Sequence, residues 1–507
     1  MLAKIFSGAV IGVDGYIVNV EVDLASGLPG FDIVGLPDSA VKESRERVRA
    51  AVRNSDYSFP VKRITVNLAP ADTRKSGPAF DLPVAVGILI CTGVMKPEAA
   101  EGAFFVGELS LDGALRPVSG VLPMVMAAKA EGICNIFVPT ENAAEAALVA
   151  GVEVFPVGSI SGLVEHFDGR GIASFASDGQ VLCPSPNTYD VDFADVSGQV
   201  HVKRALEIAA AGCHNALMIG PPGAGKTMLA RRMPTILPDL SMEESMEITK
   251  IYSIAGLLDQ KSALLRERPF RTPHHTASYG SLTGGGRIPQ PGEISLAHNG
   301  VLFLDELPEF QKKALETLRQ PLEDGQISIT RVGGSCTYPS VFLLLAAMNP
   351  CPCGYLGSTR CTCSEADVAR YLEKISGPLL DRIDIQVEAT PVEYSALAAQ
   401  GQPSENSATI KARVENARAR QQKRLHGEGI YFNAKMPAQL VKKHCKPDKE
   451  AADLLKQAFD TMKLSARAYH KILKIARTIA DLADMPEINA VHVAEAISYR
   501  GLDRKYW

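Results

Sequence analysis

The segment that most narrows what this chain can fold into is a glycine-rich loop between a predicted strand and a predicted helix. An apolar run, 216–219, precedes the loop, and a helical pattern begins at 228. The loop has the P-loop sequence GPPGAGKT, formed by Gly220, Pro221, Pro222, Gly223, Ala224, Gly225, Lys226 and Thr227. Its glycines allow successive backbone N–H groups to turn towards phosphate oxygens, and the N-terminus of the next helix adds positive potential. The pattern therefore predicts an α/β domain with a parallel sheet that binds ATP.

Two carboxylates that follow a second apolar run complete the predicted nucleotide site. Asp305 and Glu306 come directly after the run 301–304, and in such sheets ligands bind at the carboxyl ends of the strands. We expect Lys226 to reach the β- and γ-phosphates, and Thr227 and Asp305 to bind Mg²⁺. Glu306 is predicted to orient or deprotonate the attacking water. The alternative for the acidic pair is the start of an ordinary loop.

Three polar side chains further along the chain are candidates for contacts with the γ-phosphate. Asn349 follows a third apolar run and is a predicted phosphate sensor, although Asn-Pro by itself signals only a turn. Arg382 suits the arginine that a neighbouring subunit supplies to the phosphate, or it could pair within the chain with Asp381 or Asp384. Arg467, on a predicted helix, could reach the phosphates from a lid domain or be a surface arginine.

The chain has 507 residues, which is too long for one hydrophobic core, so two to four domains are expected. Alternating apolar runs and a helical pattern predict an α/β domain over 1–168. The segment 169–189 is rich in Gly, Ser and Pro and is predicted to be a linker. A second α/β domain is predicted over 190–390, and a mostly helical lid over 391–507.

Composition limits the class of protein and its compartment. The chain is 46% hydrophobic and 22% charged, which is typical of soluble globular proteins and excludes collagen-like, coiled-coil and wholly disordered classes. Its longest apolar stretch, 82–95, is too short to span a bilayer, and no signal peptide is recognisable. We therefore expect a cytoplasmic protein without a membrane partner, whose 10 cysteines are reduced or bound to metal. The net charge of −4 excludes a globally basic nucleic-acid coat, but not a local basic channel.

Together these motifs resemble the AAA+ ATPases related to the ATPase subunit of magnesium chelatase. The order of P-loop, acidic strand, Asn349, LLDR and the SARA sequence around Arg467 carries the resemblance. The segments 269–276, 291–300 and 349–354 make it specific for the bacterial ComM/YifB family. What the resemblance implies is a hexameric, ATP-driven motor on DNA, with ComM members acting in branch migration during natural transformation. The rival functions are a chelatase-like chaperone for metal insertion or protein remodelling, and an ATP-dependent protease.

The resemblance also assigns two segments to a central pore. Residues 326–341 are expected to form a β-hairpin of the kind that MCM-like relatives project into the pore, where Arg331 would contact DNA phosphates. The loop 278–290, with Arg287 beside a glycine triplet, is the second candidate. The alternative for both is a plain hairpin in solvent.

The N-terminal region resembles the Lon protease domain, which has a fold of the ribosomal S5 domain 2 type. The segment 75–83 corresponds to the Lon segment that carries the nucleophilic serine, but Ala79 stands in its place. Met124 occupies the place of the catalytic lysine. A Ser–Lys dyad needs both groups, so we expect no peptidase activity and instead a domain that holds DNA or stabilises the ring.

Four cysteines form two C-x-C pairs. Cys351 and Cys353 make the first pair, and Cys361 and Cys363 make the second. Four thiolates so close in a glycine-containing loop could hold a tetrahedral structural Zn²⁺. The spacing differs from the common C-x-x-C, and reduced thiols without a ligand are the alternative.

Two more groups of polar residues leave a choice open. The basic run 411–446 is either a solvated helix face or a set of DNA phosphate contacts. The pair His274 and His275 is either a set of hydrogen-bonded loop side chains or a set of ligands or pore contacts.

Overall fold

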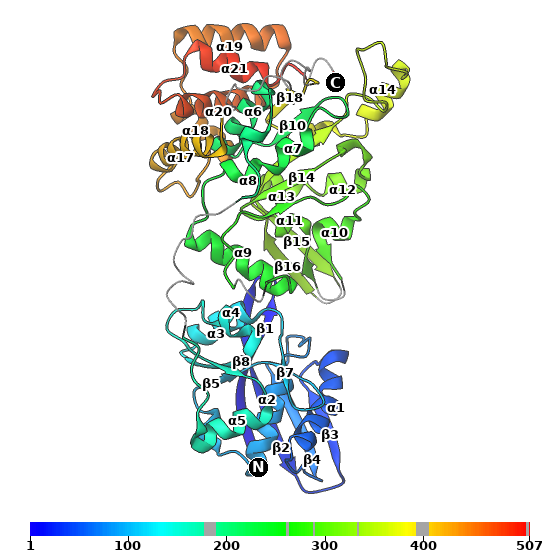
Figure 1. The fold of residues 1–507 in the computed structure, drawn as a ribbon, viewed down its shortest axis with the longest axis vertical. Coiled ribbons are helices and arrows are strands. Elements are labelled where there is room, and N and C mark those ends of the chain that lie inside the picture. The colour runs from blue at the N-terminus through cyan, green and yellow to red at the C-terminus, as the bar shows by residue number, and fades with distance from the viewer. Residues whose placement is uncertain are drawn as a thin grey trace.

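The computed structural model describes residues 1–176, 189–259, 263–286, 289–331, 334–391, 405–502 and 506, with only the backbone described for Arg331 and Gly334. The molecule is elongated, with the N-terminal unit at one end, the P-loop core in the middle and the C-terminal helices at the other end (Figure 1). This mixed α/β architecture with a parallel sheet and a helical C-terminal part confirms the predicted fold class.

The N-terminal unit is built on a seven-stranded mixed sheet with the strand order β3-β4-β2-β1-β5-β8-β9. The pairs β1–β2 and β2–β4 are antiparallel and the other pairs are parallel. The strands of this unit, including a small ribbon of β6 and β7, are β1 Leu2–Ile11, β2 Asp14–Ala25, β3 Gly30–Val34, β4 Arg63–Ala69, β5 Ala103–Phe105, β6 Glu108–Leu109, β7 Leu115–Arg116, β8 Asn135–Pro139 and β9 Glu153–Val157. Its helices are α1 Ser39–Asn54, α2 Asp81–Cys91, α3 Val121–Ala130, α4 Ala143–Ala146 and α5 Ile160–Glu165.

The start of the predicted linker remains attached to the N-terminal unit. The backbone N–H of Phe175 donates to the carbonyl of Val154 in β9 at 2.7 Å, and that of Ile172 donates to His166 Nδ1 at 2.8 Å. Packing on this unit therefore continues beyond residue 169, where composition alone predicts that the linker begins.

The core contains a five-stranded sheet with the order β11-β14-β17-β10-β18, in which every pair is parallel. Its strands are β10 Ala216–Ile219, β11 Phe270–Arg271, β14 Val301–Leu304, β17 Leu343–Met348 and β18 Ile385–Glu388. The three central strands are buried along their whole length, as expected for a parallel sheet covered on both faces. Two ribbons extend from the core, formed by β12 Gly284–Gly285 with β13 Gln290–Pro291, and by β15 Gln326–Arg331 with β16 Gly334–Pro339.

Helices surround this sheet and continue into the C-terminal part. The core helices are α6 Val200–Gly212, α7 Lys226–Arg231, α8 Met233–Ile236, α9 Met242–Ala255, α10 Tyr279–Thr283, α11 Glu293–Leu296, α12 Lys312–Glu316, α13 Arg319–Asp324, α14 Glu365–Leu372 and α15 Gly377–Leu380. The C-terminal helices are α17 Ser407–Arg424, α18 Ala438–His444, α19 Lys449–Met462, α20 Ala466–Leu482 and α21 Ala490–Ser498. One apolar cluster runs from the sheet through α6 into α17, α20 and α21, so the lid packs directly on the core.

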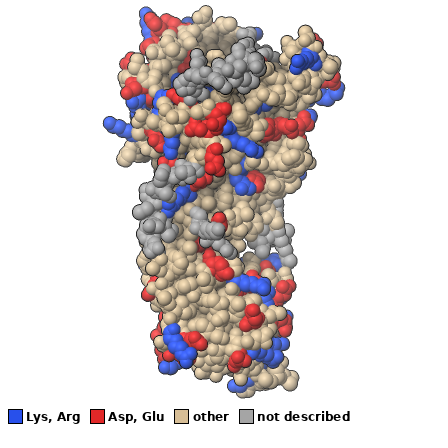
Figure 2. Space-filling model, viewed as in Figure 1, with Lys and Arg blue, Asp and Glu red and all other residues tan. Residues whose placement is uncertain are grey.

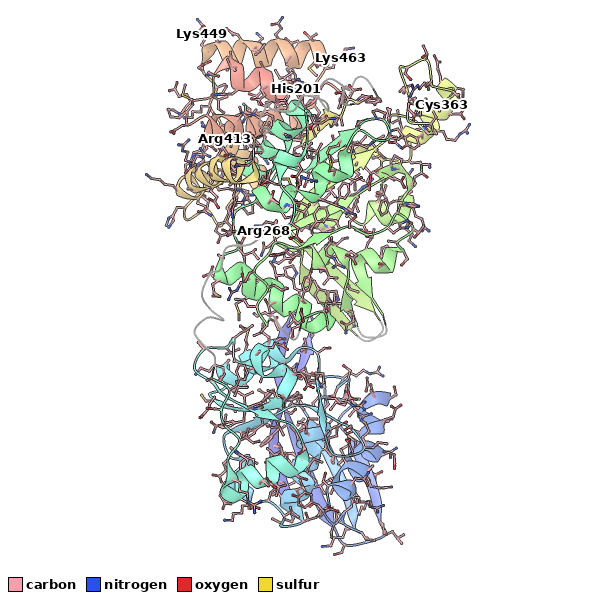
Figure 3. All side chains as sticks on the ribbon, viewed as in Figure 1. His201, Arg268, Cys363, Arg413, Lys449 and Lys463 are labelled. Atoms are coloured by element: carbon pink, nitrogen blue, oxygen red, sulfur yellow. The ribbon has the colours of Figure 1, made fainter. Side chains whose placement is uncertain are left out.

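The basic run 411–446 contributes to this packing. Arg418 is buried, and two of its guanidinium nitrogens donate to the carbonyl of Ala210 in α6 at 3.1 and 2.7 Å. Arg413, which is labelled in Figure 3, pairs with Glu207 of α6 at 2.5 Å, and Arg424 pairs with Asp481 at 2.5 Å. Arg413 and Arg418 thus hold the lid on the core and Arg424 joins two helices within the lid, so the structure does not present these three arginines as a free phosphate-binding face.

The N-terminal unit and the core meet where α3 lies beside α9. Glu145 Oε1 accepts hydrogen bonds from the backbone N–H of Leu122 at 2.8 Å and from the Ser253 hydroxyl at 2.5 Å. Burial raises the pKa of Glu145, although these hydrogen bonds act in the opposite direction. The junction thus combines a buried carboxyl with a small apolar contact of Leu122, Leu148 and Leu264.

The surface and the helices both bear on possible partners. On the face drawn in Figure 2, Lys and Arg side chains are interspersed with Asp and Glu. Throughout the described parts of the chain, each helix is too short or too polar to cross a lipid bilayer.

Candidate nucleotide site

Three of the predicted site segments meet at the carboxyl edge of the parallel sheet. The P-loop follows β10, Asp305 follows β14, and Asn349 follows β17. Ile219 at the end of β10 pairs with Met348 at the end of β17, and the backbone N–H of Gly220 donates to the Met348 carbonyl at 3.2 Å. The strand register therefore brings Asn349 beside the first residue of the P-loop.

Lys226 is held at the centre of this edge. Its Nζ donates to the carbonyls of Gly220 at 2.6 Å and Pro221 at 3.0 Å, and to Asn349 Oδ1 at 3.1 Å. The side chain is buried, and this burial lowers the pKa of Lys226 against the opposing charges of Asp305 and Glu306. Because its partners are neutral carbonyl oxygens, the ammonium charge is left for an anionic ligand.

The backbone of the P-loop has the conformation that a phosphate cradle needs. Gly223 and Gly225 have φ values of 78° and 81°, in the left-handed region that favours glycine. Gly225 is the N-cap residue of α7, and no capping side chain accepts a hydrogen bond from the first backbone N–H groups of this helix. These donors are therefore left for a ligand. The loop therefore fits the triphosphate that the sequence predicts.

The residues predicted to bind Mg²⁺ are in direct contact. Thr227 Oγ1 donates to Asp305 Oδ2 at 2.6 Å, and the backbone N–H of Glu306 donates to Asp305 Oδ1 at 2.9 Å. A hydroxyl and a carboxylate are oxygen ligands of the kind that Mg²⁺ prefers beside substrate phosphates. The donor set therefore fits this ion.

Glu306 has a partner that sequence reasoning missed. Its Oε2 lies 3.0 Å from His275 Nδ1, while the rings of His274 and His275 are 4.1 Å apart. His275 follows β11, the strand next to β14 in the parallel sheet, so both side chains come from the same edge. The position of His275 just after a strand next to β14 could have predicted its contact with Glu306, but β11 has only two residues and is not recognisable in the sequence.

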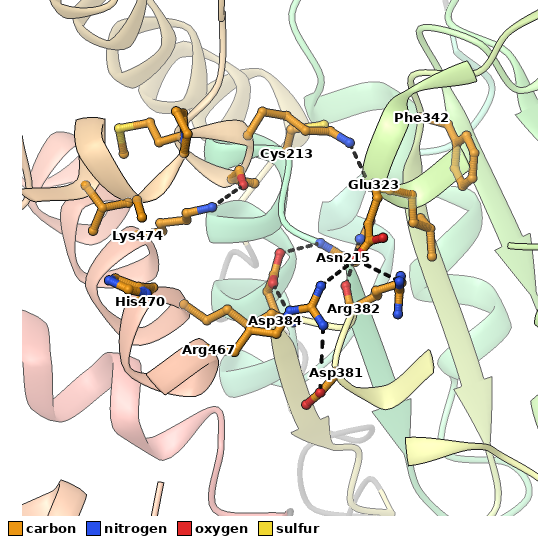
Figure 4. Close-up of a pocket in the computed structure, with 18 residues that line it drawn as sticks. Cys213, Asn215, Glu323, Phe342, Asp381, Arg382, Asp384, Arg467, His470 and Lys474 are labelled. Atoms are coloured by element: carbon orange, nitrogen blue, oxygen red, sulfur yellow. Dashed lines mark hydrogen bonds and ion pairs between the residues drawn. The ribbon is translucent and has the colours of Figure 1, made fainter. Parts of the chain in front are cut away.

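Arg382 and Arg467 lie together at the opposite edge of the sheet. Arg382 precedes β18, and its guanidinium pairs with Glu323 of α13 at 2.7 Å. Arg467, at the start of α20, pairs with the same carboxylate and lies 4.0 Å from Asp381 (Figure 4). Partial burial would raise the pKa of Glu323, but hydrogen bonds from the two arginines lower it. These side chains line a cavity of about 360 Å³.

This arrangement corrects the predicted intrachain partner of Arg382. Arg382 pairs with Glu323, whereas the alternative prediction named Asp381 or Asp384 as its partner within the chain. Asp384 instead pairs with Lys471 at 3.0 Å and lies 3.4 Å from His214 Nδ1. Burial alone would raise the pKa of Asp384, but the charge of Lys471 and the hydrogen bond from His214 hold it far below the usual range. Glu323 lies far from Arg382 in the sequence, so only the fold could reveal the pair.

The two edges of the sheet are well separated. The four residues of β18 span about 13 Å, with Arg382 before the strand and the P-loop beyond its far end. Arg467 likewise donates to Glu323, at the same edge of the sheet as Arg382. The predicted approach of Arg467 to phosphates therefore does not involve the P-loop of its own chain in this structure.

Comparisons with known proteins agree with these features. Family models described as "Subunit ChlI of Mg-chelatase", "Magnesium chelatase, subunit ChlI" and "Magnesium chelatase, subunit ChlI C-terminal" match residues 20–142, 192–397 and 404–500. The chain is 43% identical over 507 residues to Competence protein ComM of Haemophilus influenzae, covering 99% of this chain and 98% of that protein. It is also 43% identical over 503 residues to YifB of Salmonella typhimurium, covering 99% and 98%. The chain belongs to the ComM/YifB family.

ComM/YifB membership confirms the resemblance read from the motifs and relates the core to magnesium-chelatase-like AAA+ ATPases. A more distant relative, the magnesium-chelatase 67 kDa subunit of Chlorobaculum parvum, is 28% identical over 211 residues, which are 41% of this chain and 28% of that protein.

The pore candidates of this ComM/YifB chain are described only in part. The predicted hairpin is present as β15 and β16, and the backbone of Arg331 pairs with Gly334 at its end. The side chain of Arg331 and the whole of Arg287 lie outside the described residues. Their contacts with DNA remain predictions.

The two positions that the Lon resemblance assigns to a Ser–Lys dyad are apolar and buried. Ala79 and Met124 belong to one hydrophobic cluster of the N-terminal unit. The neighbouring Lys75 is buried, and its Nζ donates to the Thr73 carbonyl at 2.8 Å. No nucleophile–base pair stands at these two positions.

The four C-x-C cysteines converge. Their sulfur atoms all lie within 4.8 Å of one another, a grouping compatible with a zinc site. Backbone N–H groups of Thr362 and Tyr355 lower the pKa of Cys353 to about 6.

Proposed function

We propose that this protein is an ATPase that assembles into a ring, a hexamer by analogy with the AAA+ resemblance. The observation that carries the proposal is the position of the P-loop and of the Arg382–Arg467 pair on opposite edges of one sheet. A chain with this geometry cannot bring its arginines to its own phosphates. A head-to-tail neighbour can, and repeated head-to-tail contacts form a ring when the rotation between successive subunits closes.

In the proposed site each side chain has one task. Lys226 binds the β- and γ-phosphates, and Thr227 and Asp305 hold Mg²⁺, which neutralises charge on the phosphate oxygens. Glu306, oriented by His275, takes a proton from the attacking water or aligns it. Asn349, already hydrogen-bonded to Lys226, contacts the γ-phosphate.

The arginines would come from the neighbouring subunit. Release of Arg382 or Arg467 from Glu323 would free a cation for the charge that develops on the γ-phosphate. The proposed cofactors are therefore ATP and Mg²⁺, with a structural Zn²⁺ at the four cysteines.

DNA is the proposed substrate of the motor. The support is the identity of 43% to a protein named for competence, together with the β15–β16 hairpin. We propose that the hairpin with Arg331, and the segment with Arg287, contact DNA phosphates in the pore of a cytoplasmic ring. The action would be helicase activity or branch migration of joint molecules during natural transformation.

The test is the response of ATP hydrolysis and strand separation to DNA structure. Three-strand and four-way junctions should stimulate ATP hydrolysis by the wild-type protein and be unwound by it. The Lys226→Ala variant should neither hydrolyse ATP nor unwind the junctions. A wild-type protein that hydrolyses ATP at one rate with and without any DNA would refute the DNA-motor proposal.

A second candidate function is a chelatase-like chaperone that remodels a protein or inserts a metal. Its support is the match of three chelatase-subunit models along the chain. Stimulation of the ATPase by a protein partner and not by DNA would favour it. A third, proteolysis, is disfavoured by Ala79 and Met124, and casein degradation by the purified protein would revive it.

A further inference from the structure

The cysteine cluster has the dimensions of a metal site. Cys351 Sγ lies 3.4 Å from Cys353 Sγ and 3.9 Å from Cys361 Sγ, and the last two sulfurs are 3.7 Å apart. Four sulfurs at about 2.3 Å from a tetrahedral Zn²⁺ are about 3.8 Å from one another. A disulfide would need about 2.0 Å, and all four cysteines are free. The sulfurs are thus spaced as ligands of one ion.

Backbone turns fix the loop that carries the sulfurs. The N–H of Gly354 donates to the carbonyl of Cys351 at 3.0 Å, and that of Cys361 donates to the carbonyl of Ser358 at 3.1 Å. Hydrogen bonds around the ligands of a metal hold those ligands in position.

The segment 351–363 has almost no apolar core of its own. Within it only Cys351 and Gly354 are buried, and its one large aliphatic side chain, Leu356, is exposed. A chain segment that buries so little apolar surface needs another crosslink to keep one conformation. A zinc ion on four cysteines would supply that crosslink (Cys363 is labelled in Figure 3).

The same segment follows directly after the nucleotide site in the chain and contacts it at the P-loop. Asn349, which accepts from Lys226 Nζ, is two residues before Cys351. Gly354 lies so close to the P-loop that a β-carbon on it would be 2.5 Å from Pro222 Cδ. The position of the cluster is therefore coupled to both the P-loop and the candidate sensor.

We propose that Cys351, Cys353, Cys361 and Cys363 bind one Zn²⁺, and that the bound ion holds Gly354 against Pro222 and Asn349 at Lys226, so that the zinc centre positions the ATP site. The coupling to ATP rests on the proposed ATPase function, whereas the zinc centre itself does not.

The first test is metal content. Untagged, chelator-washed wild-type protein should contain close to one zinc per chain by elemental analysis. A Cys353→Ser, Cys361→Ser variant should lose the zinc, and the control Cys134→Ser, which changes a cysteine outside the cluster, should keep it. Wild-type protein with almost no zinc would overturn the proposal.

The second test separates the contact with the P-loop from the metal. Gly354 and Gly357 have nearly the same φ, 86° and 84°, but a β-carbon at Gly357 would have no neighbour within 4 Å. Gly354→Ala and Gly357→Ala therefore carry similar backbone strain, and only the first displaces Pro222. Both variants should keep zinc, and Gly354→Ala should bind ATP about tenfold more weakly than Gly357→Ala by titration calorimetry.

The outcomes distinguish the two proposals. Equal ATP affinities of the two glycine variants, with wild-type binding intact, would refute the positioning role and leave the ATPase proposal standing. Wild-type protein that contains zinc and binds no ATP would refute the ATPase proposal and, with it, the positioning role.

Discussion

ATP hydrolysis at each site should require Arg382 of the neighbouring subunit, and not Arg382 of the subunit whose P-loop binds that nucleotide. Arg382 is separated from the P-loop of its own chain by the whole length of β18. Each proposed site is therefore formed by residues of two subunits. The perturbation that exposes this arrangement is a mixture of two inactive variants, Lys226→Ala and Arg382→Ala. Each variant alone should be inactive, because every site lacks either its lysine or its arginine.

The size of the recovery follows from the geometry. In an equal, random mixture a site is intact when its nucleotide-binding chain carries Arg382→Ala and its neighbour carries Lys226→Ala. The chance of this is one half for each chain, so about one quarter of the sites are intact, and activity approaches about one quarter of wild type if the sites act independently. Loss of such an arginine lowers turnover by about 10³-fold or more, so the background is negligible.

The assay is ATP hydrolysis after the subunits are mixed in the presence of junction DNA. The matched control mixes Lys226→Ala with Glu306→Gln. Both of these residues lie on the same edge of one chain, so no site in that mixture is intact and no recovery is expected. Recovery with Arg382→Ala that does not exceed this control would refute the two-subunit site.

Three further predictions concern single positions. Glu306→Gln should bind ATP with nearly wild-type affinity in a filter assay but not hydrolyse it, so that rings remain on DNA; wild-type turnover would contradict the role of Glu306. Because burial raises the pKa of Glu145, the folded state keeps its proton to higher pH than the unfolded chain, and the free energy of unfolding should fall as pH rises above about 4.3. Glu145→Gln should flatten that decrease in urea unfolding between pH about 4 and pH about 7, and an unchanged slope would contradict the assignment. Arg413→Ala should lower the free energy of unfolding by about 1 kcal/mol and leave the salt dependence of DNA binding unchanged, since its partners Glu207 and Glu405 lie within the chain; a shallower salt dependence would instead indicate a phosphate contact.

Local sequence patterns were sufficient to predict the P-loop and the strands that support it. The apolar run 216–219 is β10, and Gly223 and Gly225 in the loop that follows it adopt left-handed backbone conformations that other residues disfavour. Asp305 and Asn349 were predictable for a related reason, because each follows a continuous apolar strand of a parallel sheet. The carboxyl ends of such strands share one edge, so order along the chain already implies proximity.

Contacts between distant segments were not predictable from those patterns. The basic run 411–446 is open to two interpretations as a sequence, and only the packing of α17 on α6 shows that Arg413 and Arg418 face carboxylate and carbonyl oxygens of the core. Glu323, which lies between Arg382 and Arg467, and His275, which lies beside Glu306, carry no local signal of their roles.

The sequence by itself determined which groups can bind a triphosphate and a metal ion, because backbone freedom and ligand chemistry are properties of single residues and short spacings. Only the tertiary structure decided that Arg382 and Arg467 gather on Glu323 at the other edge of the sheet, away from the P-loop. Side chains separated by more than a hundred residues meet through the order and direction of the strands, and that order put Lys226 and Arg382 at opposite ends of one sheet.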